Sequence, residues 1–366
     1  MTAVVSSRAE EGKTPVCLVL STGRCGSTLL SNVVRAHPGA LSISELFSAL
    51  RDHNLTEREL DGTEFWEMLS KSCTTDLIGL RCGLRVDEML YPAFSPREGA
   101  SRFSWRTGLP PLMSTLPHLT TRPDDLYSCL EVLTPREPRK LLSEHLRWLF
   151  SVLAQGRQPS VIVERSGGSL AYASRLMTLF PDARVVHLFR DGRECAVSMS
   201  RHARYKFAAI RAALRGKLGY DPYAEFGADG LGSRSQEPFK LAEDEELAGL
   251  MPYSMTRENF DNYDVPLTRY GAMWSMMIVQ GLADLPSPPD LLTIDYNHLV
   301  SRPGEVIGQF VDFLGIDRDS QLEQQLVNSI RGKRRSRDEI GEERWQELTR
   351  ACSMGMNRMY GRGSWM

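Results

Sequence analysis

The chain has 366 residues, of which 42% are hydrophobic and 25% charged, and its formal net charge is -2. These are ordinary values for a globular protein, and they give no global signal for nucleic acid or a membrane surface; any anion site must be a local concentration of positive charge. The length predicts a loose leader over 1–14 and a single domain over 15–366, with insertions at about 51–130 and 203–266.

The seven cysteines include no CxxC pair. Their odd number in a chain of this size favours a reduced intracellular protein over a disulfide framework. The first 15 residues carry acids and lack a cationic segment followed by an apolar one, so we expect no secretory signal. No apolar run reaches the roughly 18 residues of a membrane span. We therefore predict a cytoplasmic protein with no membrane span and no nucleic-acid partner.

Apolar runs and helical spacings alternate along the chain. Residues 16–20 are wholly apolar, as in a parallel strand buried on both faces, and a helix over 27–39 follows. Residues 41–130 look irregular, apart from a helical piece at 63–72. Later segments predict strands over 160–165, 183–190 and 290–299, and helices over 139–156, 170–181, 193–205, 267–285 and 304–316. This alternation predicts an α/β fold with a parallel sheet, whose ligands bind outside the carboxyl ends of the strands.

The turn after the first strand, Ser21-Thr-Gly-Arg-Cys-Gly-Ser-Thr28, is suited to an anion. The N–H groups at a helix N-terminus converge on one spot that the helix dipole makes positive. The glycines allow the backbone to wrap closely, the two final hydroxyls add hydrogen-bond donors, and Arg24 adds a planar cation. An ATP-binding loop of the GxxxxGK[ST] type would need a lysine where Gly26 stands. An ordinary strand–turn–helix connection is the alternative.

Cysteine chemistry is a second way to interpret this turn. A thiol at a helix start can be a nucleophile with a lowered pKa, which Cys25 would provide. A phosphatase loop also needs an arginine six positions later, and Ser31 stands there. Cys195 has Arg201 at that spacing, but its neighbours lack a glycine and are typical of a helix interior, so we treat this match as chance.

A second strand-to-helix segment, "VVHLFRDGRECAVSMSRH", repeats this arrangement with a different sequence. Arg190 ends the strand and Ser198 follows eight residues later, so both would face the same crevice as the first turn. The alternative is that Asp191 caps the helix while Arg190 forms a surface ion pair. Two anion-suited strand ends in one sheet predict a ligand such as a nucleotide with a 5′-linked group and a separate 3′-phosphate.

Three segments together resemble the sulfotransferase family that uses 3′-phosphoadenosine 5′-phosphosulfate (PAPS). "STGRCGSTLLSNVVRAHP" resembles its 5′-phosphosulfate loop, "FRDGRECAVSM" its 3′-phosphate motif, and "LLTIDYNHLVSRPGEVIGQFVDFLGI" its later strand and helix. The similarity covers roughly 15–50, 160–202 and 267–316. It implies a P-loop-like parallel sheet flanked by helices, and sulfuryl transfer from PAPS to an alcohol. The product would be 3′-phosphoadenosine 5′-phosphate (PAP), and no metal would be required.

The resemblance also assigns roles to individual residues. Arg24 takes the place of the basic residue at the phosphosulfate bridge. Arg190 and Ser198 would hold the 3′-phosphate, and Tyr296 would lie near the nucleotide. The 5′ end would be lined by Gly23, Cys25, Gly26, Ser27 and Thr28. The basic loop 331–335 either closes over the 3′-phosphate or is a solvated charge cluster.

The resemblance suggests two candidates for the general base that takes the acceptor's proton. In the tyrosylprotein and related bacterial branches, a glutamate after the "HP" turn is the base, and Glu45 matches that place. The cytosolic branch uses a histidine from an "HLP"-like segment, which His118 in "LPHLT" distantly resembles. None of the seven histidines forms a metal-binding spacing such as HExxH.

The acceptor itself is the least determined part of the prediction. We expect the insertions at 51–130 and 203–266 to cover the acceptor site as a lid. They mix arginines with aromatic residues, which suits a small-molecule, lipid or carbohydrate-bearing alcohol, although core packing explains aromatics equally well. The apolar helix within 267–285 is either core or a dimer face, which leaves a homodimer open. A catalytically silent nucleotide-binding protein of the same fold, or a P-loop kinase, is the alternative function.

Overall fold

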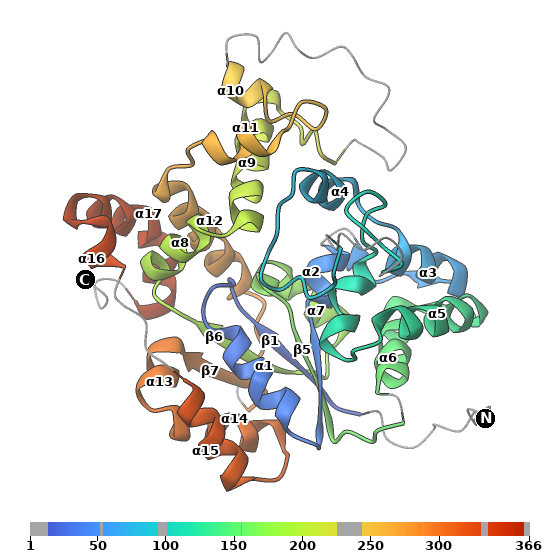
Figure 1. Ribbon diagram of the computed structural model, residues 1–366. Helices are drawn as coiled ribbons and strands as arrows, with labels where there is room; N and C mark the ends of the chain where they lie inside the picture. The colour runs from blue at the N-terminus through green and yellow to red at the C-terminus, as the bar shows by residue number, and fades with distance from the viewer. Residues whose placement is uncertain are drawn as a thin grey trace.

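A sheet of five parallel strands in the order β2-β5-β1-β6-β7 forms the centre of the molecule (Figure 1). The computed structural model describes residues 14–51, 54–93, 101–154, 156–224, 244–287, 289–330 and 336–361. The strands are β1 (Val16–Leu20), β2 (Ala40–Ser44), β5 (Val161–Arg165), β6 (Arg184–Phe189) and β7 (Leu291–Asp295). The α/β fold with a parallel sheet and flanking helices is therefore confirmed.

Burial explains why the central strands are apolar runs. Every residue of β1 and β5 is buried, as expected for parallel strands covered on both faces. β1 lies between β5 and β6, pairing Val16 with Ile162 and Leu20 with His187. The edge strand β7 is more exposed. The four strands that the sequence predicts are all present within one or two residues of their expected starts, and β7 ends earlier than its predicted segment, which included the exit from the strand.

The strand β2 corrects the prediction that the chain becomes irregular from residue 41. Its sequence, Ala-Leu-Ser-Ile-Ser, is short and contains two polar residues, yet all five residues are buried. It pairs in parallel with β5, from Ala40 opposite Val161 to Ser44 opposite Arg165. Strand formation here depends on the neighbour rather than on intrinsic preference. As a result, Glu45 stands at the carboxyl end of a strand.

The helices that connect or follow the strands form two groups. In one, α12 packs against both α8 and α17; in the other, α13, α14 and α15 follow β7, and α15 reaches α1 (Figure 1). These helices, together with four outside the two groups, are α1 (Ser27–Ala36), α2 (Leu46–Leu50), α6 (Leu142–Leu153), α7 (Ala173–Leu179), α8 (Gly192–Ser200), α12 (Leu267–Gly281), α13 (Tyr296–Ser301), α14 (Pro303–Leu314), α15 (Ser320–Ser329), α16 (Arg337–Ile340) and α17 (Glu342–Tyr360). On α12, Tyr270 and Trp274 are fully buried and Met276 is exposed, so one face of this helix belongs to the core.

The single helix predicted over 193–205 is wrong, because the chain breaks it into α8 and α9. α8 ends at Ser200, and α9 (Ala203–Leu218) begins after an extended His202, whose φ is -116° and ψ 119°. The buried ring of His202 bonds to the carboxylate of Glu88, and this contact has no local sequence signal. The break turns His202 toward the carboxyl ends of the strands.

The two insertions pack against each other through a hydrophobic cluster separate from that of the sheet. Ile78 of α4 lies in this cluster with Phe207 of α9 and Phe260 of α11. In Figure 1 this group lies above the carboxyl ends of the strands. The remaining elements are β3 (Glu59–Leu60), β4 (Lys140–Leu141), α3 (Gly62–Ser70), α4 (Thr74–Arg81), α5 (Pro123–Leu133), α10 (Glu245–Ala248), α11 (Arg257–Asn262) and the 3-10 turns η2 (Pro111–Ser114), η3 (Leu116–His118), η4 (Thr134–Arg136) and η5 (Ser169–Tyr172).

Two further features bear on the sequence predictions. All seven cysteines are free thiols. Across the described ranges, the helices are too short or too polar for any of them to traverse a lipid bilayer.

Candidate active site

A cavity of about 230 Å³ lies where the five strands end. Each strand contributes to it: the turn after β1, Glu45 after β2, Arg165 at the end of β5, Arg190 after β6 and Tyr296 after β7. Ligands of open parallel sheets bind at this edge. Most of the predicted site residues line this one cavity: Gly23, Arg24, Gly26, Ser27, Thr28, Glu45, Arg190, Ser198 and Tyr296.

The turn before α1 is held in a conformation that needs its glycines. Gly23 and Gly26 have φ of 78° and 90°, in the left-handed region that L side chains rarely adopt. A Cβ on Gly23 would lie 1.7 Å from the hydroxyl of Tyr205, and one on Gly26 would lie 2.4 Å from the ring of Tyr296. Both the backbone and the close neighbours therefore exclude a side chain at these two positions.

Two predicted site residues carry strained backbone. Arg24 has φ of 58° and Glu45 has φ of 62°; with Arg51 they make up the non-glycine residues of positive φ in the described ranges. Such residues cost free energy, and they cluster at functional sites where the surrounding structure enforces them. The strain thus marks Arg24 and Glu45 independently of the sequence motifs.

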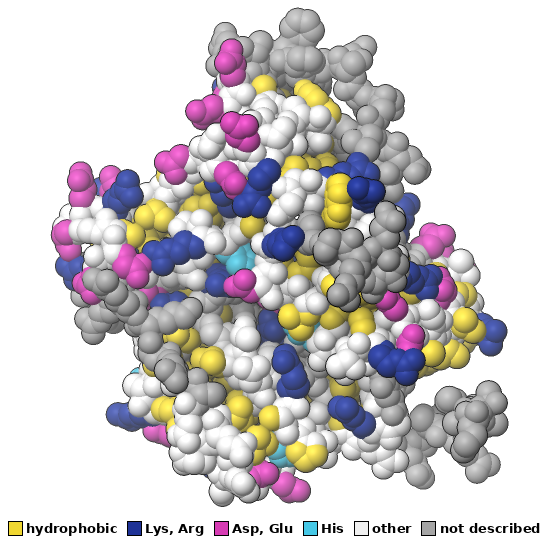
Figure 2. Space-filling model, viewed as in Figure 1, with side chains coloured by type: hydrophobic (Ala, Val, Ile, Leu, Met, Phe, Trp, Pro, Cys, Tyr) yellow, Lys and Arg dark blue, Asp and Glu magenta, His cyan; other side chains and the backbone are white. Residues whose placement is uncertain are grey.

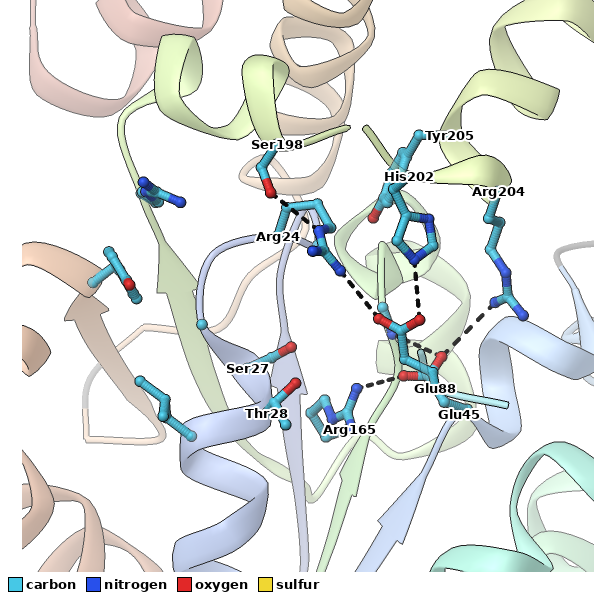
Figure 3. A pocket seen from close by; sticks show the side chains of 16 residues that line it. Arg24, Ser27, Thr28, Glu45, Glu88, Arg165, Ser198, His202, Arg204 and Tyr205 are labelled. Atoms are coloured by element: carbon cyan, nitrogen blue, oxygen red, sulfur yellow. Dashed lines mark hydrogen bonds and ion pairs between the residues drawn. The ribbon is translucent and has the colours of Figure 1, made fainter. Parts of the chain in front are cut away.

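Arg24 joins the two anion motifs directly. Its Nε donates to Ser198 Oγ at 3.2 Å, and its Nη1 donates to Glu88 Oε1 at 3.2 Å (Figure 3). Ser198 lies on α8, the helix that follows the second motif. The structure thus places the turn after β1 and the helix after β6 within hydrogen-bond distance of each other.

Arg190, which directly follows β6 in the second motif, is buried. Its Nη2 donates to Glu194 Oε2 at 2.8 Å, and its guanidinium carbon lies 4.7 Å from the centroid of the Tyr296 ring. Asp191 caps α8 by accepting from the N–H of Arg193. The cap and ion pair of the alternative interpretation are therefore both present, but the pair is 9% exposed at Arg190 rather than on the surface.

The Nε of Arg190 is buried and has no hydrogen-bond partner among the residues that the structure describes. Buried polar groups are nearly always hydrogen-bonded, so an unsatisfied guanidinium N–H calls for an explanation. Because Arg190 lines the cavity, an anionic ligand there would provide the missing acceptor.

Cys25 is the predicted site residue whose side chain points elsewhere. Its thiol is fully buried and donates to the main-chain oxygen of Leu188 at 3.4 Å, so it lies in the core rather than in the cavity. Burial raises the pKa of the Cys25 thiol, and burial raises that of Cys195 well above its usual value. A nucleophilic cysteine needs the opposite shift.

Glu45 is fixed from several sides. Arg165 Nη1 donates to its Oε1, Ser48 Oγ donates to Oε2 at 2.7 Å, and the N–H of Gly167 donates to Oε2 at 3.3 Å. Arg204 Nη1 lies 3.8 Å from the same oxygen (Figure 3). The Glu45 and Arg165 side chains are each 4% exposed, so this is a buried ion pair.

A second carboxylate, Glu88, enters the cavity from the first insertion. Its Oε2 accepts from His202 Nε2 at 3.0 Å, while Oε1 accepts from Arg24. Burial would raise the pKa of Glu88, but the hydrogen bond and charge of His202, together with Arg24, lower it to about 2. His118, the alternative base, does not line the cavity; its Nε2 bonds to the main-chain oxygen of Glu88 at 3.1 Å.

A further glutamate, Glu164, is buried close enough to Glu45 for their charges to interact. Glu164 on β5 is fully buried and accepts from Ser166 Oγ at 2.6 Å. Burial raises the pKa of Glu164 to about 8, and the neighbouring charge of Glu45 acts in the same direction. Glu164 is therefore protonated near neutral pH, which spares the site a second buried negative charge.

The cavity as a whole is positive. Four arginines and two glutamates line it, so arginines exceed carboxylates by two. Figure 2 shows Lys and Arg side chains spread over the middle of this face, with a histidine and an acidic side chain among them. The near-neutral chain thus has the local concentration of positive charge that an anion site requires.

Several predictions about other groups have different outcomes. The basic loop 331–335 lies outside the described residues, as does Phe94, one of the aromatic residues of the first insertion that we expect at the acceptor site. Of the aromatics predicted for the acceptor site, Phe65, Phe207 and Phe260 are buried in the hydrophobic clusters, whereas Tyr205 lines the cavity. Within the ranges described, His, Cys, Asp and Glu side chains form no group of three or more that could hold a metal ion.

Sequence reasoning missed four charged or titratable residues of the cavity: Glu88, Arg165, His202 and Arg204. Arg165 ends a correctly predicted strand, so the rule that identified Arg190 could have found it. Glu88 lies in an insertion, and His202 and Arg204 lie at an unpredicted helix break. No local pattern distinguishes these three from surface residues.

The fold and the cavity together define an α/β protein with a positively charged cavity at the carboxyl edge of its parallel sheet. Two family profiles match the chain: one described as the sulfotransferase family over 93–229, and one described as the sulfotransferase domain over 172–358. The second spans just over half of the 366 residues. The chain therefore belongs to the sulfotransferase family.

Solved structures of distant sulfotransferases also match. A sulfotransferase domain from the curacin biosynthetic pathway is 16% identical, with 91% of this chain and 82% of that chain covered and a TM-score of 0.42. The sulfotransferase domain of the Synechococcus PCC 7002 olefin synthase is 15% identical, with 96% of this chain and 90% of that chain covered and a TM-score of 0.41. Sulfotransferase STF9 from Mycobacterium avium is 11% identical, with 94% of this chain and 76% of that chain covered and a TM-score of 0.40. No curated protein matches the chain.

Proposed function

We propose that this protein transfers the sulfuryl group of PAPS to the hydroxyl of a small-molecule, lipid or carbohydrate acceptor and releases PAP. The observation that carries the proposal is the convergence of two motifs, about 170 residues apart in the chain, on one positive cavity. Arg24 and Arg190 both line this cavity, and the buried Nε of Arg190 has no hydrogen-bond partner among the described residues. Membership of the sulfotransferase family supports the reaction type.

The proposed binding roles take the two ends of the nucleotide from the family resemblance, and the positions of these residues in the cavity support them. The N-terminal N–H groups of α1 and the hydroxyls of Ser27 and Thr28 would hold the 5′ end, where the helix dipole favours negative charge. Arg190 and Ser198 would hold the 3′-phosphate. PAPS, when bound, supplies a sulfuryl group attached to a phosphate leaving group.

Arg24 would stabilise the charge that develops on the bridging oxygen as the sulfur–oxygen bond to phosphate breaks. Its guanidinium is pre-positioned, because Ser198 accepts from Nε and the left-handed backbone fixes where the side chain begins. Pre-organised donors of this kind contribute about 3–4 kcal/mol each to lowering a barrier.

Glu45 would take the proton of the acceptor hydroxyl while the acceptor oxygen bonds to sulfur. The contacts from Arg165, Ser48 and Gly167 hold the carboxylate in one orientation at the edge of the cavity. A carboxylate suffices for this step, because an alcohol oxygen becomes strongly acidic as it forms its bond to sulfur. Proton transfer to Glu45 and departure of the phosphate then complete the exchange of one sulfur–oxygen bond for another.

One observation favours a second candidate, a nucleotide-binding protein without catalysis. Both oxygens of Glu45 already accept hydrogen bonds in the structure, so a base must exchange one of these contacts for the acceptor hydroxyl. A P-loop kinase would need a lysine at the position that Gly26 occupies, so it is the weaker alternative. The cytoplasmic location, the homodimer and the lack of a metal requirement stay predictions.

Two measurements test the proposal. Calorimetry with PAP should give saturable heat, and Mg-ATP should compete poorly with it. Radiolabelled PAPS, incubated with a panel of hydroxylated metabolites, should then transfer label to at least one of them, which mass spectrometry identifies by its mass shift. PAP binding without any transfer would favour the silent binding protein, and tight Mg-ATP binding without PAP binding would favour a kinase.

A further inference from the structure

Glu88 places a carboxylate at the end of the cavity where Arg24 stands. The Arg24 and Glu88 side chains are each 24% exposed and are joined at 3.2 Å between Nη1 and Oε1. Arg24 Nε is already bonded to Ser198, so Glu88 takes up a guanidinium N–H that faces the cavity. Figure 3 shows the Glu88 carboxylate lying between Arg24 and His202.

We propose that Glu88 occupies the position at Arg24 that the 5′ anionic group of the nucleotide takes, so that a bound nucleotide must displace it. This inference rests on the proposed function, because it assumes that Arg24 binds the 5′ end. Carboxylate and phosphate oxygens accept from a guanidinium in the same way, so one can stand in for the other.

The two anions cannot share this place. A carboxylate beside a phosphate or sulfate group, both directed at one N–H, adds like-charge repulsion at close range. The pKa of Glu88 is lowered to about 2 while it is paired, so the side chain is a charged carboxylate when the nucleotide arrives. The side chain must therefore move away when the nucleotide binds.

The Glu88 side chain is more exposed than that of Glu45 and is held by fewer contacts, so it can move more easily. The Glu45 carboxylate is buried and bonded to Arg165, Ser48 and a main-chain N–H at the edge of the sheet. The Glu88 side chain comes from an insertion, is partly exposed, and is bonded to Arg24 and His202. His202 Nε2 can keep one oxygen of Glu88 while the other leaves Arg24. Glu88 would thus weaken binding of nucleotides that carry a 5′ anion and would favour release of the product.

The test compares two nucleotides that differ at one end. PAP carries both phosphates, whereas adenosine 3′-monophosphate lacks the 5′ anion that would compete with Glu88. We expect Glu88→Gln, which removes the charge and keeps the shape, to tighten PAP binding by about tenfold or more in calorimetry. The affinity for adenosine 3′-monophosphate should stay within about twofold of the wild-type value.

Two controls separate the contact from general electrostatics. Asp87→Asn removes the same charge from the neighbouring residue and should change PAP affinity by less than about twofold. In an Arg24→Ala background, adding Glu88→Gln should give no gain, because the group for which the two anions compete is missing. Circular dichroism and thermal unfolding verify that each variant is folded.

The outcomes are distinct. Unchanged or weaker PAP binding by folded Glu88→Gln would overturn the inference, since Glu88 would then not compete for Arg24. An equal gain for both nucleotides, or a persistent gain in the Arg24→Ala background, would overturn it as well. If neither nucleotide bound the wild-type protein or Glu88→Gln, the proposed function itself would fail, and the inference with it.

Discussion

Replacing Arg165 with methionine would leave the carboxylate of Glu45 buried without its main partner. Both side chains are 4% exposed, and Arg165 also donates from Nε to Ser31 Oγ at 2.8 Å. Removing one member of a buried ion pair costs about 3–5 kcal/mol. Arg204 lies 3.8 Å from Glu45 and is 42% exposed, so it offsets only a small part of this loss.

The expected shift in melting temperature follows from the size of the chain. Unfolding entropy is about 2.1 cal/mol/K per residue, so over 366 residues a loss of about 3–5 kcal/mol lowers Tm by about 4–7 °C. In urea, the midpoint should fall while the slope m stays constant, because the surface exposed on unfolding is the same.

A charge-free double variant and an exposed pair serve as controls. Arg165→Met combined with Glu45→Gln should recover most of the lost stability, since no unpaired buried charge is left. Arg139 is 51% exposed and pairs with Asp61 and Glu64, so Arg139→Met should cost less than about 1 kcal/mol. A loss below about 1 kcal/mol for Arg165→Met, or no recovery in the double variant, would refute the reasoning.

Three further predictions concern the cavity and the buried Glu164 near it. Arg24→Ala and Glu45→Ala should each lower kcat with PAPS by about two or more orders of magnitude, and near-wild-type turnover in Glu45→Ala would remove it as the base. Arg190→Ala should weaken PAP binding by about tenfold or more and leave the binding of adenosine 5′-monophosphate unchanged, because that nucleotide lacks the 3′-phosphate; calorimetry would contradict this assignment if both affinities fell alike. Burial raises the pKa of Glu164 to about 8 in the folded protein, whereas the ordinary value of 4.5 applies to the unfolded chain. Between these two values the folded protein holds one more proton than the unfolded chain. The contribution of Glu164 to the free energy of unfolding therefore falls as pH rises through this window, by at most about 1.4 kcal/mol per pH unit. Glu164→Gln should therefore gain stability relative to wild type between about pH 5 and 8 in urea titrations, and a constant difference would count against the raised pKa.

The sequence was sufficient for the parts of the fold that local pattern controls. β1, β5 and β6 are largely apolar runs because parallel strands inside the sheet are buried on both faces, and each ends at or just before turn-forming or charged residues. β7, at the edge of the sheet, is more exposed and begins with the apolar pair Leu291 and Leu292. Parallel strands bring their carboxyl ends to one edge, so the positions of Arg24 and Arg190 after two such strands predict that they share one cavity. In the structure both residues line the cavity at that edge.

Other parts of the site depend on neighbours that no local pattern identifies. Two of the five residues of β2 are serine, and it is a strand because it pairs with β5; that pairing sets the place of Glu45. Cys25 lies within the predicted turn, yet the direction of its side chain into the core follows from the packing of β6 beside it.

The sequence by itself determined the α/β class, the two anion motifs and the family resemblance, because these depend on residue type and spacing over short stretches. Only the tertiary structure decided what surrounds them. Arg165 meets Glu45 across 120 residues, and Glu88 meets Arg24 across 64, through an insertion positioned by its own hydrophobic cluster. Such contacts are set by how distant surfaces bury apolar area against each other, and no window of sequence contains both partners.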